Sequence, residues 1–324
     1  MNKDFELTLL SEGQIWGTRK ESQLYVMERY GIKAAITDLC ILTGCCISNK
    51  KYIDGGKITG RFWTKSKFDW SKSQSLLDYD IYPYDVCAVD ENGEWFDVRR
   101  YSRQYAVRPV LQSSFIFSQI FSKRVKGYNG IEEVEYGEYP QWAADPKMQK
   151  LLELEYSRGM YKTGESYTFD SAEIKTWVTD EIEFKPETYD VYEYLGRKYI
   201  RVKANFPFGI REFTLSNNKK YKNGDYVWVE VSPVKWLIDE KTHTLISKYG
   251  LVSGIKFQVR WKKMKNSGAR CDSPYVGDFN KTEMYEYLNQ YMAKDLFQSL
   301  SFVYDQDMYP KEKGAKKKLL FFRI

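Results

Sequence analysis

The chain has 324 residues, of which 43% are apolar and 29% charged, and its formal net charge is +6. This composition excludes a disordered chain, and the length allows one large domain or two ordinary ones without disulfides or metals. Residues 1–13 carry charges instead of an apolar run, and no stretch approaches the roughly 18 apolar residues of a membrane span. We therefore expect a cytoplasmic protein with no membrane association.

The first half of the chain predicts short helices and aromatic strands. Residues 21–30 have helix-forming content that Gly31 would end, and residues 34–42 continue as an apolar run. Residues 60–112 alternate aromatic runs with turn signals. Among these, Asp90-Glu91-Asn92-Gly93, between apolar residues 86–89 and 95–98, is typical of a β-hairpin.

The second half predicts further strands and two longer helices. The expected elements are a strand over 131–141 ending at Pro140, a helix over 146–158, a hairpin of 191–194 and 199–204, strands at 225–231, 234–238 and 244–247, and a helix over 282–300. Pro233 is expected to separate two of these strands, and residues 163–185 give no clear pattern. The mixture indicates an α+β fold.

Charge is distributed unevenly along the chain. Residues 256–270 include six basic side chains and no acidic one, residues 311–323 six basic and one acidic, and residues 78–97 seven acidic and no basic one. Apolar side chains alternate with basic or polar ones over residues 255–262, which predicts a strand with one core face and one basic face. The basic tail is either a solvated segment or an attachment point for phosphate or an acidic protein.

Residues of common catalytic and metal sites are scarce. His243 is the single histidine and is expected in a surface turn, so histidine triads and multi-histidine metal sites are excluded. No nucleotide-binding glycine loop and no G-x-S-x-G elbow occurs. The five cysteines lack C-x-x-C spacing and are expected to be reduced and mostly in the core: Cys40, Cys45, Cys46, Cys87 and Cys271.

Acidic residues give no stronger candidate for catalysis. Asp305 and Asp307 could hold a divalent ion, but no phosphate-binding element surrounds them. We therefore predict no enzymatic activity, no cofactor and no metal site. An enzyme missed by this reasoning would reveal itself by a deep pocket with perturbed carboxylates.

Two motifs resemble a known family. Phe62-Trp63-Thr64-Lys65-Ser66 is followed by Ala106-Val107-Arg108-Pro109-Val110-Leu111. The pattern is similar to that of an uncharacterised bacterial and phage family whose domain looks like the formylglycine-generating-enzyme branch of the C-type lectin fold. Lys65 stands where that family usually has arginine.

Other segments resemble the same family in a different order. Residues 7–12 and 34–38 resemble the part before the tryptophan strand, whereas the family's opening elements resemble residues 137–141, 234–238, 245–248 and 285–297. The resemblance implies circular permutation, which is tolerated because domain termini often lie close together. Residues 1–125 would form the C-terminal half, residues 126–310 the N-terminal half with an insertion at about 145–225, and residues 311–324 a basic tail and terminal strand. Two incomplete domains side by side are the alternative.

The resemblance implies a fold more than an activity. The expected fold is α+β, a C-type-lectin-like core of short antiparallel strands with a few helices and an additional β-rich elaboration. The paired-cysteine motif of the sulfatase-modifying enzymes and the Glu-Pro-Asn or Gln-Pro-Asp loops of calcium-dependent lectins do not occur. The implied function is a rigid platform for binding loops.

Aromatic residues point to a binding function. The chain has 27 Tyr, 18 Phe and 9 Trp, and tyrosine, tryptophan and arginine are enriched in interface hot spots, although β-rich proteins also place tyrosine in half-buried strands. Trp63 and Trp95 are expected in the core. The predicted ligand-binding residues are Trp70, Tyr79, Tyr82, Tyr84, Arg99, Arg100, Tyr101 and Arg103. We expect a recognition protein with a protein or other macromolecular partner, in an oligomeric state that the sequence leaves open.

Two alternatives stay open. The acidic residues 78–97 could mimic phosphate in a phage or mobile-element inhibitor of a bacterial defence nuclease. Direct nucleic-acid binding would instead use Lys256, Arg260, Trp261, Lys262, Lys263, Lys265 and Arg270. Ionic strength separates these readings, because phosphate binding weakens steeply with salt and aromatic protein contacts do not.

Overall fold

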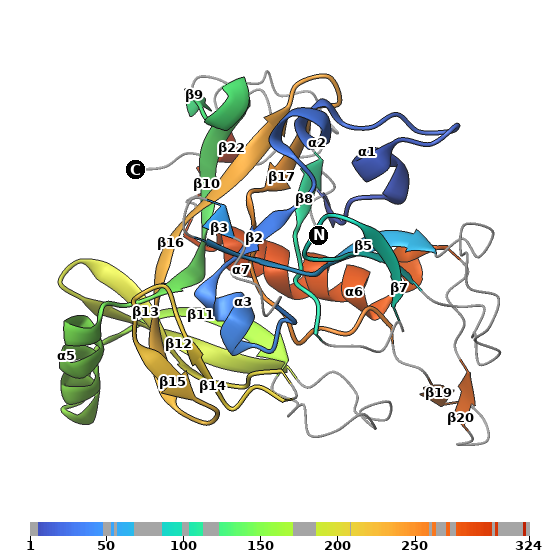
Figure 1. The fold of residues 1–324 in the computed structure, drawn as a ribbon. Helices are drawn as coiled ribbons and strands as arrows, with labels where there is room; N and C mark the ends of the chain where they lie inside the picture. Colours follow the sequence, from blue (N-terminus) through green and yellow to red (C-terminus); the bar gives the residue numbers. More distant parts are fainter. Residues whose placement is uncertain are drawn as a thin grey trace, which may run out of the picture.

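The computed structural model describes residues 6–47, 53–54, 57–67, 86–98, 104–112, 123–170, 186–207, 209–258, 261–263, 270–272, 277–299, 302–303 and 320–321. Strands are the main element, and nearly all of them pair antiparallel, so the expected α+β class with antiparallel sheets is confirmed. Figure 1 shows the elements gathered around one long, twisted sheet.

The helices are mostly short. They are α1 (Glu12–Trp16), α2 (Tyr25–Tyr30), α3 (Asp38–Leu42), α5 (Pro146–Ser157), α6 (Glu283–Glu286) and α7 (Ala293–Phe297), with the 3-10 helices η3 (Tyr128–Gly130) and η4 (Phe279–Lys281) and the π-helix η5 (Tyr287–Met292).

Strands from both halves of the chain share the main sheet. They are β1 (Glu6–Thr8), β8 (Val110–Gln112), β9 (Val125–Lys126), β10 (Glu132–Ala143), β11 (Lys162–Asp170), β12 (Pro186–Tyr194), β13 (Arg197–Lys203), β16 (Tyr226–Asp239) and β17 (Thr244–Ser247). Their order is β1-β8-β17-β16-β13-β12-β11, with β10 pairing β16 and β9. The smaller sheets contain β2 (Ala34–Ile36), β3 (Ile53–Asp54), β4 (Lys57–Gly60) and β18 (Tyr249–Gly250); β5 (Phe62–Lys67), β6 (Val86–Val89) and β7 (Trp95–Val98); β14 (Glu212–Thr214) and β15 (Lys220–Lys222); β19 (Trp261–Lys263) and β20 (Arg270–Asp272); and β21 (Phe302–Val303) and β22 (Leu320–Phe321).

The long strand β16 is the centre of the main sheet, and it runs through Pro233 where two strands were expected. Proline has no N–H for the ladder and is therefore found where a strand lacks a partner. On one edge of β16, pairing with β13 stops at Val231 and pairing with β17 starts at Trp236. Pro233 lies in the gap, so the missing N–H breaks no ladder bond there.

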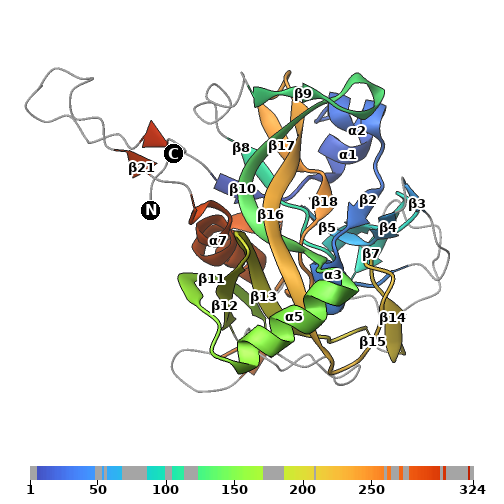
Figure 2. The ribbon, with the colours of Figure 1, turned by 90° about the vertical axis from the view of Figure 1, so that its left-hand side faces the viewer.

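Two hydrophobic clusters cover the two faces of β16. Val227 and Val229 belong to the main core, whereas the alternating Trp228 packs in a smaller cluster with Leu152 of α5. Figure 2 shows α5 lying across β13 and β16 on this side. Burying a side chain such as Leu152 contributes about 2 kcal/mol, which holds α5 in place.

The predicted helix over residues 146–158 is confirmed as α5. Residues close to each end specify where this helix begins and stops. The Asp145 side chain accepts hydrogen bonds from the backbone N–H groups of Lys147 and Met148, and Pro146 occupies the first turn. The helix ends at Ser157, with Gly159 at a φ of 90° just beyond it.

The C-terminal helix is also confirmed, as α6, η5 and α7 in succession, with a π-helical middle that the sequence did not indicate. Thr282 caps its start by accepting the N–H of Tyr285. The Asn289 amide accepts the N–H of Leu7 at 3.1 Å and donates to its carbonyl at 2.9 Å. The free edge of β1 is thereby covered.

Gly137 allows this helix to approach β10 closely. Its φ is 71°, and a Cβ at this position would lie 2.6 Å from the carbonyl oxygen of Leu296. Any side chain would push α7 away from the sheet. β10 continues through Pro140, the expected end of the strand, to Ala143, with bulges on either side of the Glu138–Pro140 stretch.

Several expectations require correction. Residues 34–42 divide into strand β2 and helix α3 because Thr37 caps the helix. The helix expected over 21–30 begins only at Tyr25, and β11 was missed.

Residues 255–258 form no strand and are buried throughout, including Lys256 at 3% exposure. The expected alternation of a core face and a basic face is therefore wrong for this stretch.

The two hairpins were predicted correctly. The first comprises β6 and β7, and the second comprises β12 and β13 around Leu195 and Gly196. The two halves of the proposed permutation share the main sheet through the pairing of β8 with β17, and they share the main core. The permuted domain division itself stays a prediction.

Candidate recognition site

The predicted ligand-binding residues fall in two segments, residues 68–85 and 99–103, which lie outside the described residues. The residues that flank these segments are described, and they are neighbours. Lys67 at the end of β5 pairs with Val86 at the start of β6, and Val86 pairs with Val98 at the end of β7. Both predicted segments therefore connect to the same end of one three-stranded sheet.

The three-stranded sheet is anchored in the core. Phe62, Trp63 and Thr64 of β5 are each 0% exposed, and the Trp63 ring centroid lies 4.8 Å from that of Tyr105. The backbone N–H of Trp63 donates to the carbonyl of Ala106 at 3.1 Å. Trp63 is thus a core residue as predicted, whereas Trp95 is 39% exposed and the prediction for it is wrong.

The opposite end of this sheet is a tightly bonded turn. The Asp90 carboxylate accepts the N–H groups of Asn92 and Glu94, each at 2.8 Å. Glu91 pairs with Arg61 at 2.7 Å. Burial opposes ionisation of Glu91, but the hydrogen bond from Arg61, a hydrogen bond from the backbone of Glu91 itself and the positive charge of Arg61 together outweigh it and lower the pKa of that carboxyl. These two acidic side chains have local roles, which counts against their use as phosphate mimics.

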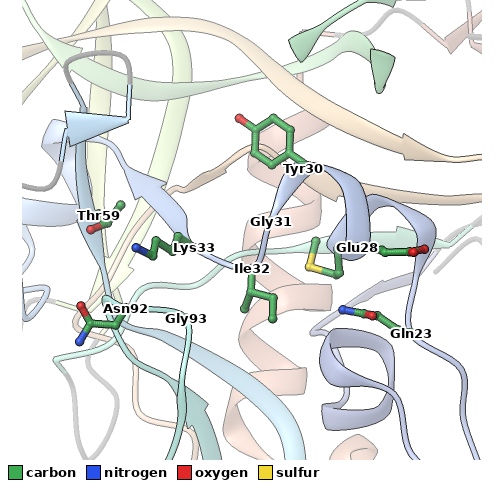
Figure 3. A pocket seen from close by; sticks show the side chains of 10 residues that line it. Gln23, Glu28, Tyr30, Gly31, Ile32, Lys33, Thr59, Asn92 and Gly93 are labelled. Atoms are coloured by element: carbon green, nitrogen blue, oxygen red, sulfur yellow. The ribbon is translucent and has the colours of Figure 1, made fainter. Parts of the chain in front are cut away.

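A pocket of about 660 Å³ lies between α2 and this turn. Figure 3 shows Gln23 and Glu28 on one side, Thr59 and Asn92 on the other, and Lys33 extending toward the latter pair. Its volume falls in the range of small-ligand pockets. Sequence reasoning missed it because α2 and the turn are far apart in the chain, and no motif marks either wall.

Arg108 fixes one wall of this pocket. It is 1% exposed, and it donates from Nη1 to the carbonyl of Ile32 at 3.3 Å and from Nε to that of Ser247 at 3.0 Å. Its guanidinium also lies 5.3 Å from the Phe62 ring. Burial lowers the pKa of Arg108 to about 10. The arginine of the Val-Arg-Pro motif therefore joins segments of the fold and does not face a ligand.

The alternative nucleic-acid residues are placed only in part. Lys256 is buried, so it does not offer a charge to solvent. In the paired strands β19 and β20, Trp261 pairs with Asp272, Lys262 with Cys271 and Lys263 with Arg270. Arg260 and Lys265 lie outside the described residues.

Other chemistry is sparse in the described part of the chain. It contains no group of three or more His, Cys, Asp or Glu side chains placed to hold a metal ion. His243 lies in the exposed turn after β16 with a φ of 51°. Cys40, Cys45 and Cys87 are buried free thiols and Cys46 is a half-buried one. Asp305 and Asp307 lie outside the described residues, as does nearly all of the basic tail.

No helix within the described ranges combines the length and apolarity that a membrane crossing requires. Comparison with known proteins gives no match among protein-family models, curated proteins or solved structures. The resemblance to the lectin-like family therefore stays a prediction, and function has to be inferred from the chain itself.

Proposed function

We propose that this is a non-enzymatic recognition protein that binds a macromolecular partner, in the first place a protein, through residues 68–85 and 99–103. The observation that carries the proposal is the pairing of Lys67 with Val86 and of Val86 with Val98. It gives two segments rich in tyrosine, tryptophan and arginine a common attachment on a buried sheet.

This arrangement suits recognition for a physical reason. Binding residues are commonly carried by loops on a rigid scaffold, because the scaffold limits the entropy lost on binding. Trp, Tyr and Arg contribute most of the binding energy in typical interfaces. The predicted set consists only of these three types: Trp70, Tyr79, Tyr82, Tyr84, Arg99, Arg100, Tyr101 and Arg103.

The finer assignments belong to the same proposal. The platform would be a circularly permuted C-type-lectin-like core, and the protein would act in the cytoplasm. A phage or mobile-element role against a defence nuclease is one version, in which the partner is the nuclease. The second candidate is nucleic-acid binding by β19 and β20, where Lys263 and Arg270 are register partners.

A comparative capture experiment tests the proposal. The full chain, immobilised, is incubated with lysate of the cells that encode it, alongside a Trp70→Ala/Tyr82→Ala/Tyr84→Ala/Arg99→Ala variant. The control variant is Tyr161→Ala/Arg158→Ala, because both residues are exposed and belong to a different segment of the chain. A protein retained by the wild type and control but lost from the fourfold variant is expected. Equal retention by all three would contradict the proposal, and salt-labile nucleic acid as the only capture would favour the second candidate.

A further inference from the structure

A cluster of exposed cations surrounds the hairpin of β14 and β15. Its members are Lys203 at the end of β13 and four residues of the hairpin region, Arg211, Lys219, Lys220 and Lys222. We call these five residues, together with Tyr226, the basic hairpin surface. None of its six residues belongs to residues 68–85, to residues 99–103, to β19 or to β20.

Nearby acidic side chains neutralise little of this charge. Glu212 pairs with Lys220 at 2.9 Å, and the Asp225 carboxylate accepts the backbone N–H of Lys222 at 2.8 Å. Within the described part of the chain, Lys203, Arg211, Lys219 and Lys222 form no ion pair. These four cations therefore lack an ion pair among the described residues, while Lys219 lies 4.8 Å from the centroid of the Tyr221 ring and Glu212 attracts Lys222 as well as Lys220.

The backbone segments that carry three of these cations meet at one turn. Asn223, next to Lys222, donates its N–H to the carbonyl of Arg211 at 3.0 Å. The Lys203 side chain passes Gly224, since a Cβ on that glycine would lie 3.9 Å from Lys203 Cε. The chain at Lys203, Arg211 and Lys222 is thus brought together around residues 223–225, although these residues come from three separate segments.

The hairpin is fixed to the body of the protein. At its tip, the Ser216 N–H and hydroxyl both donate to the carboxylate of Asp38, which is 2% exposed. Asn217 donates to the carbonyl of Ala144 at 2.7 Å and to the hydroxyl of Tyr221 at 2.9 Å. The cations are therefore presented on a rigid support, which reduces the entropy lost when they bind.

An exposed aromatic ring adjoins the cations. Tyr226 is 51% exposed and is the register partner of Lys203 across β13 and β16. The Arg201 guanidinium lies 3.7 Å from the centroid of the Tyr226 ring and 4.9 Å from that of Tyr156. An aromatic side chain beside unpaired cations is the combination that single-stranded nucleic acids bind, with phosphates on the cations and a base on the ring.

We infer that the basic hairpin surface binds single-stranded nucleic acid. Lys203, Arg211 and Lys222 contact successive phosphates, and Tyr226 stacks with a base. A single strand carries both binding groups in alternation, a phosphate for each cation and a flat base for the ring, whereas an acidic side chain has no flat face to stack on the tyrosine, which is why the single strand is the better fit.

Fluorescence anisotropy of a labelled oligothymidine with the full chain tests this inference. Lys203→Glu/Lys222→Glu is expected to weaken binding by about 10-fold or more at low salt. Lys147→Glu/Lys150→Glu on α5 changes the net charge equally at exposed positions and is expected to weaken it less than about 3-fold. Tyr226→Ala should cost about 5-fold or more through lost stacking, whereas Tyr161→Ala, at a residue 71% exposed, should have no effect.

Several results would overturn the inference. Equal losses in the two charge-reversed variants would show a response to net charge alone. Loss in Lys262→Glu/Lys263→Glu but not in Lys203→Glu/Lys222→Glu would place binding on β19. Undiminished binding by Tyr226→Ala, or competition by polyglutamate as strong as by unlabelled oligothymidine, would show attraction of any polyanion instead of recognition of a single strand. Absence of binding at low salt would exclude the site.

Discussion

Arg108 donates a hydrogen bond from Nε to the backbone carbonyl of Ser247, a residue 139 positions further along the chain. The two residues belong to two motifs that resemble one family in swapped order, Val-Arg-Pro at 107–109 and Leu-Ile-Ser-Lys at 245–248. Their strands are adjacent, since Ile246 pairs with Val110. The motifs of both halves therefore meet in one sheet, as a permuted domain would require, although the permutation stays a prediction.

Arg108 is expected to be a major stabilising residue. Arg108→Met keeps most of the side-chain volume but leaves the carbonyls of Ile32 and Ser247 without their donor. We expect the free energy of unfolding, measured by urea denaturation, to fall by about 2–4 kcal/mol. Arg158→Met, at a side chain 63% exposed, should change it by less than about 0.5 kcal/mol. Similar values for both variants would show that the buried bonds of Arg108 add no stability.

Asp295 should make stability depend on pH. The carboxyl is 4% exposed and accepts the N–H of Thr168 at 2.7 Å, and burial raises its pKa from 3.8 to about 7. The folded state binds the proton more tightly than the unfolded state does, so this contribution is complete below about pH 4 and is lost as the pH rises to 7.

The Asp295→Asn variant isolates this effect. Between pH 4 and 7, the unfolding free energy of the wild type should fall relative to that of the variant by about 1.4 kcal/mol per pH unit. Above pH 7 the difference should become constant. Chemical denaturation at several pH values measures it, with Asp190→Asn at an exposed site as the control. Parallel curves for wild type and Asp295→Asn would contradict the prediction.

Asp38 should couple the basic hairpin to the core. Its carboxylate accepts the N–H groups of Ser216 and of Ala143, the latter at 2.8 Å. Asp38→Ala leaves both groups without this acceptor, and we expect a loss of about 2–3 kcal/mol. Hydrogen exchange should also accelerate in residues 212–222 more than in the β12–β13 hairpin. Uniform acceleration across both hairpins would indicate a global effect only.

The turn at Leu195 should be open to stabilisation. Leu195 has a φ of 51°, is 75% exposed and precedes Gly196 with a φ of 72°. Asparagine tolerates this left-handed conformation better than leucine does. Leu195→Asn should therefore add about 0.5–1 kcal/mol, seen as a higher melting temperature. Leu154→Asn, at an exposed position of α5, should not stabilise, and an unchanged or lower melting temperature for Leu195→Asn would refute the explanation.

Local signals predicted the elements that local chemistry specifies. The Asp90 turn could be predicted because the side chain of Asp90 bonds its own turn. The helix α5 could be predicted because it begins at Pro146 and Gly159 follows its end. Elements set by distant partners were missed or misplaced. β16 continues through Pro233 because neither β13 nor β17 pairs with it at that residue. Lys256 is buried by surrounding segments, which the alternating pattern of residues 255–262 could not reveal.

The two candidate sites also differ in how much of each could be predicted from the sequence. The aromatic and arginine residues of 68–85 and 99–103 could be selected from composition alone, but their common attachment depends on pairing between three strands. The basic hairpin surface was not predicted because Lys203, Arg211 and Lys222 come from three separate segments, and each is an ordinary surface cation in the sequence. Only the meeting of their backbone segments at residues 223–225 distinguishes them.

Site-specific photocross-linking tests the central claim most directly. Benzoylphenylalanine is placed at Tyr82, at Tyr84 or, as the control, at the exposed Tyr161, and the full chain is irradiated in host lysate after nuclease treatment. The account predicts one protein cross-linked from positions 82 and 84 and not from 161, with a yield that high salt does not abolish. The same products from all three positions, or none from 82 and 84 while Tyr161 gives one, would contradict recognition through these segments.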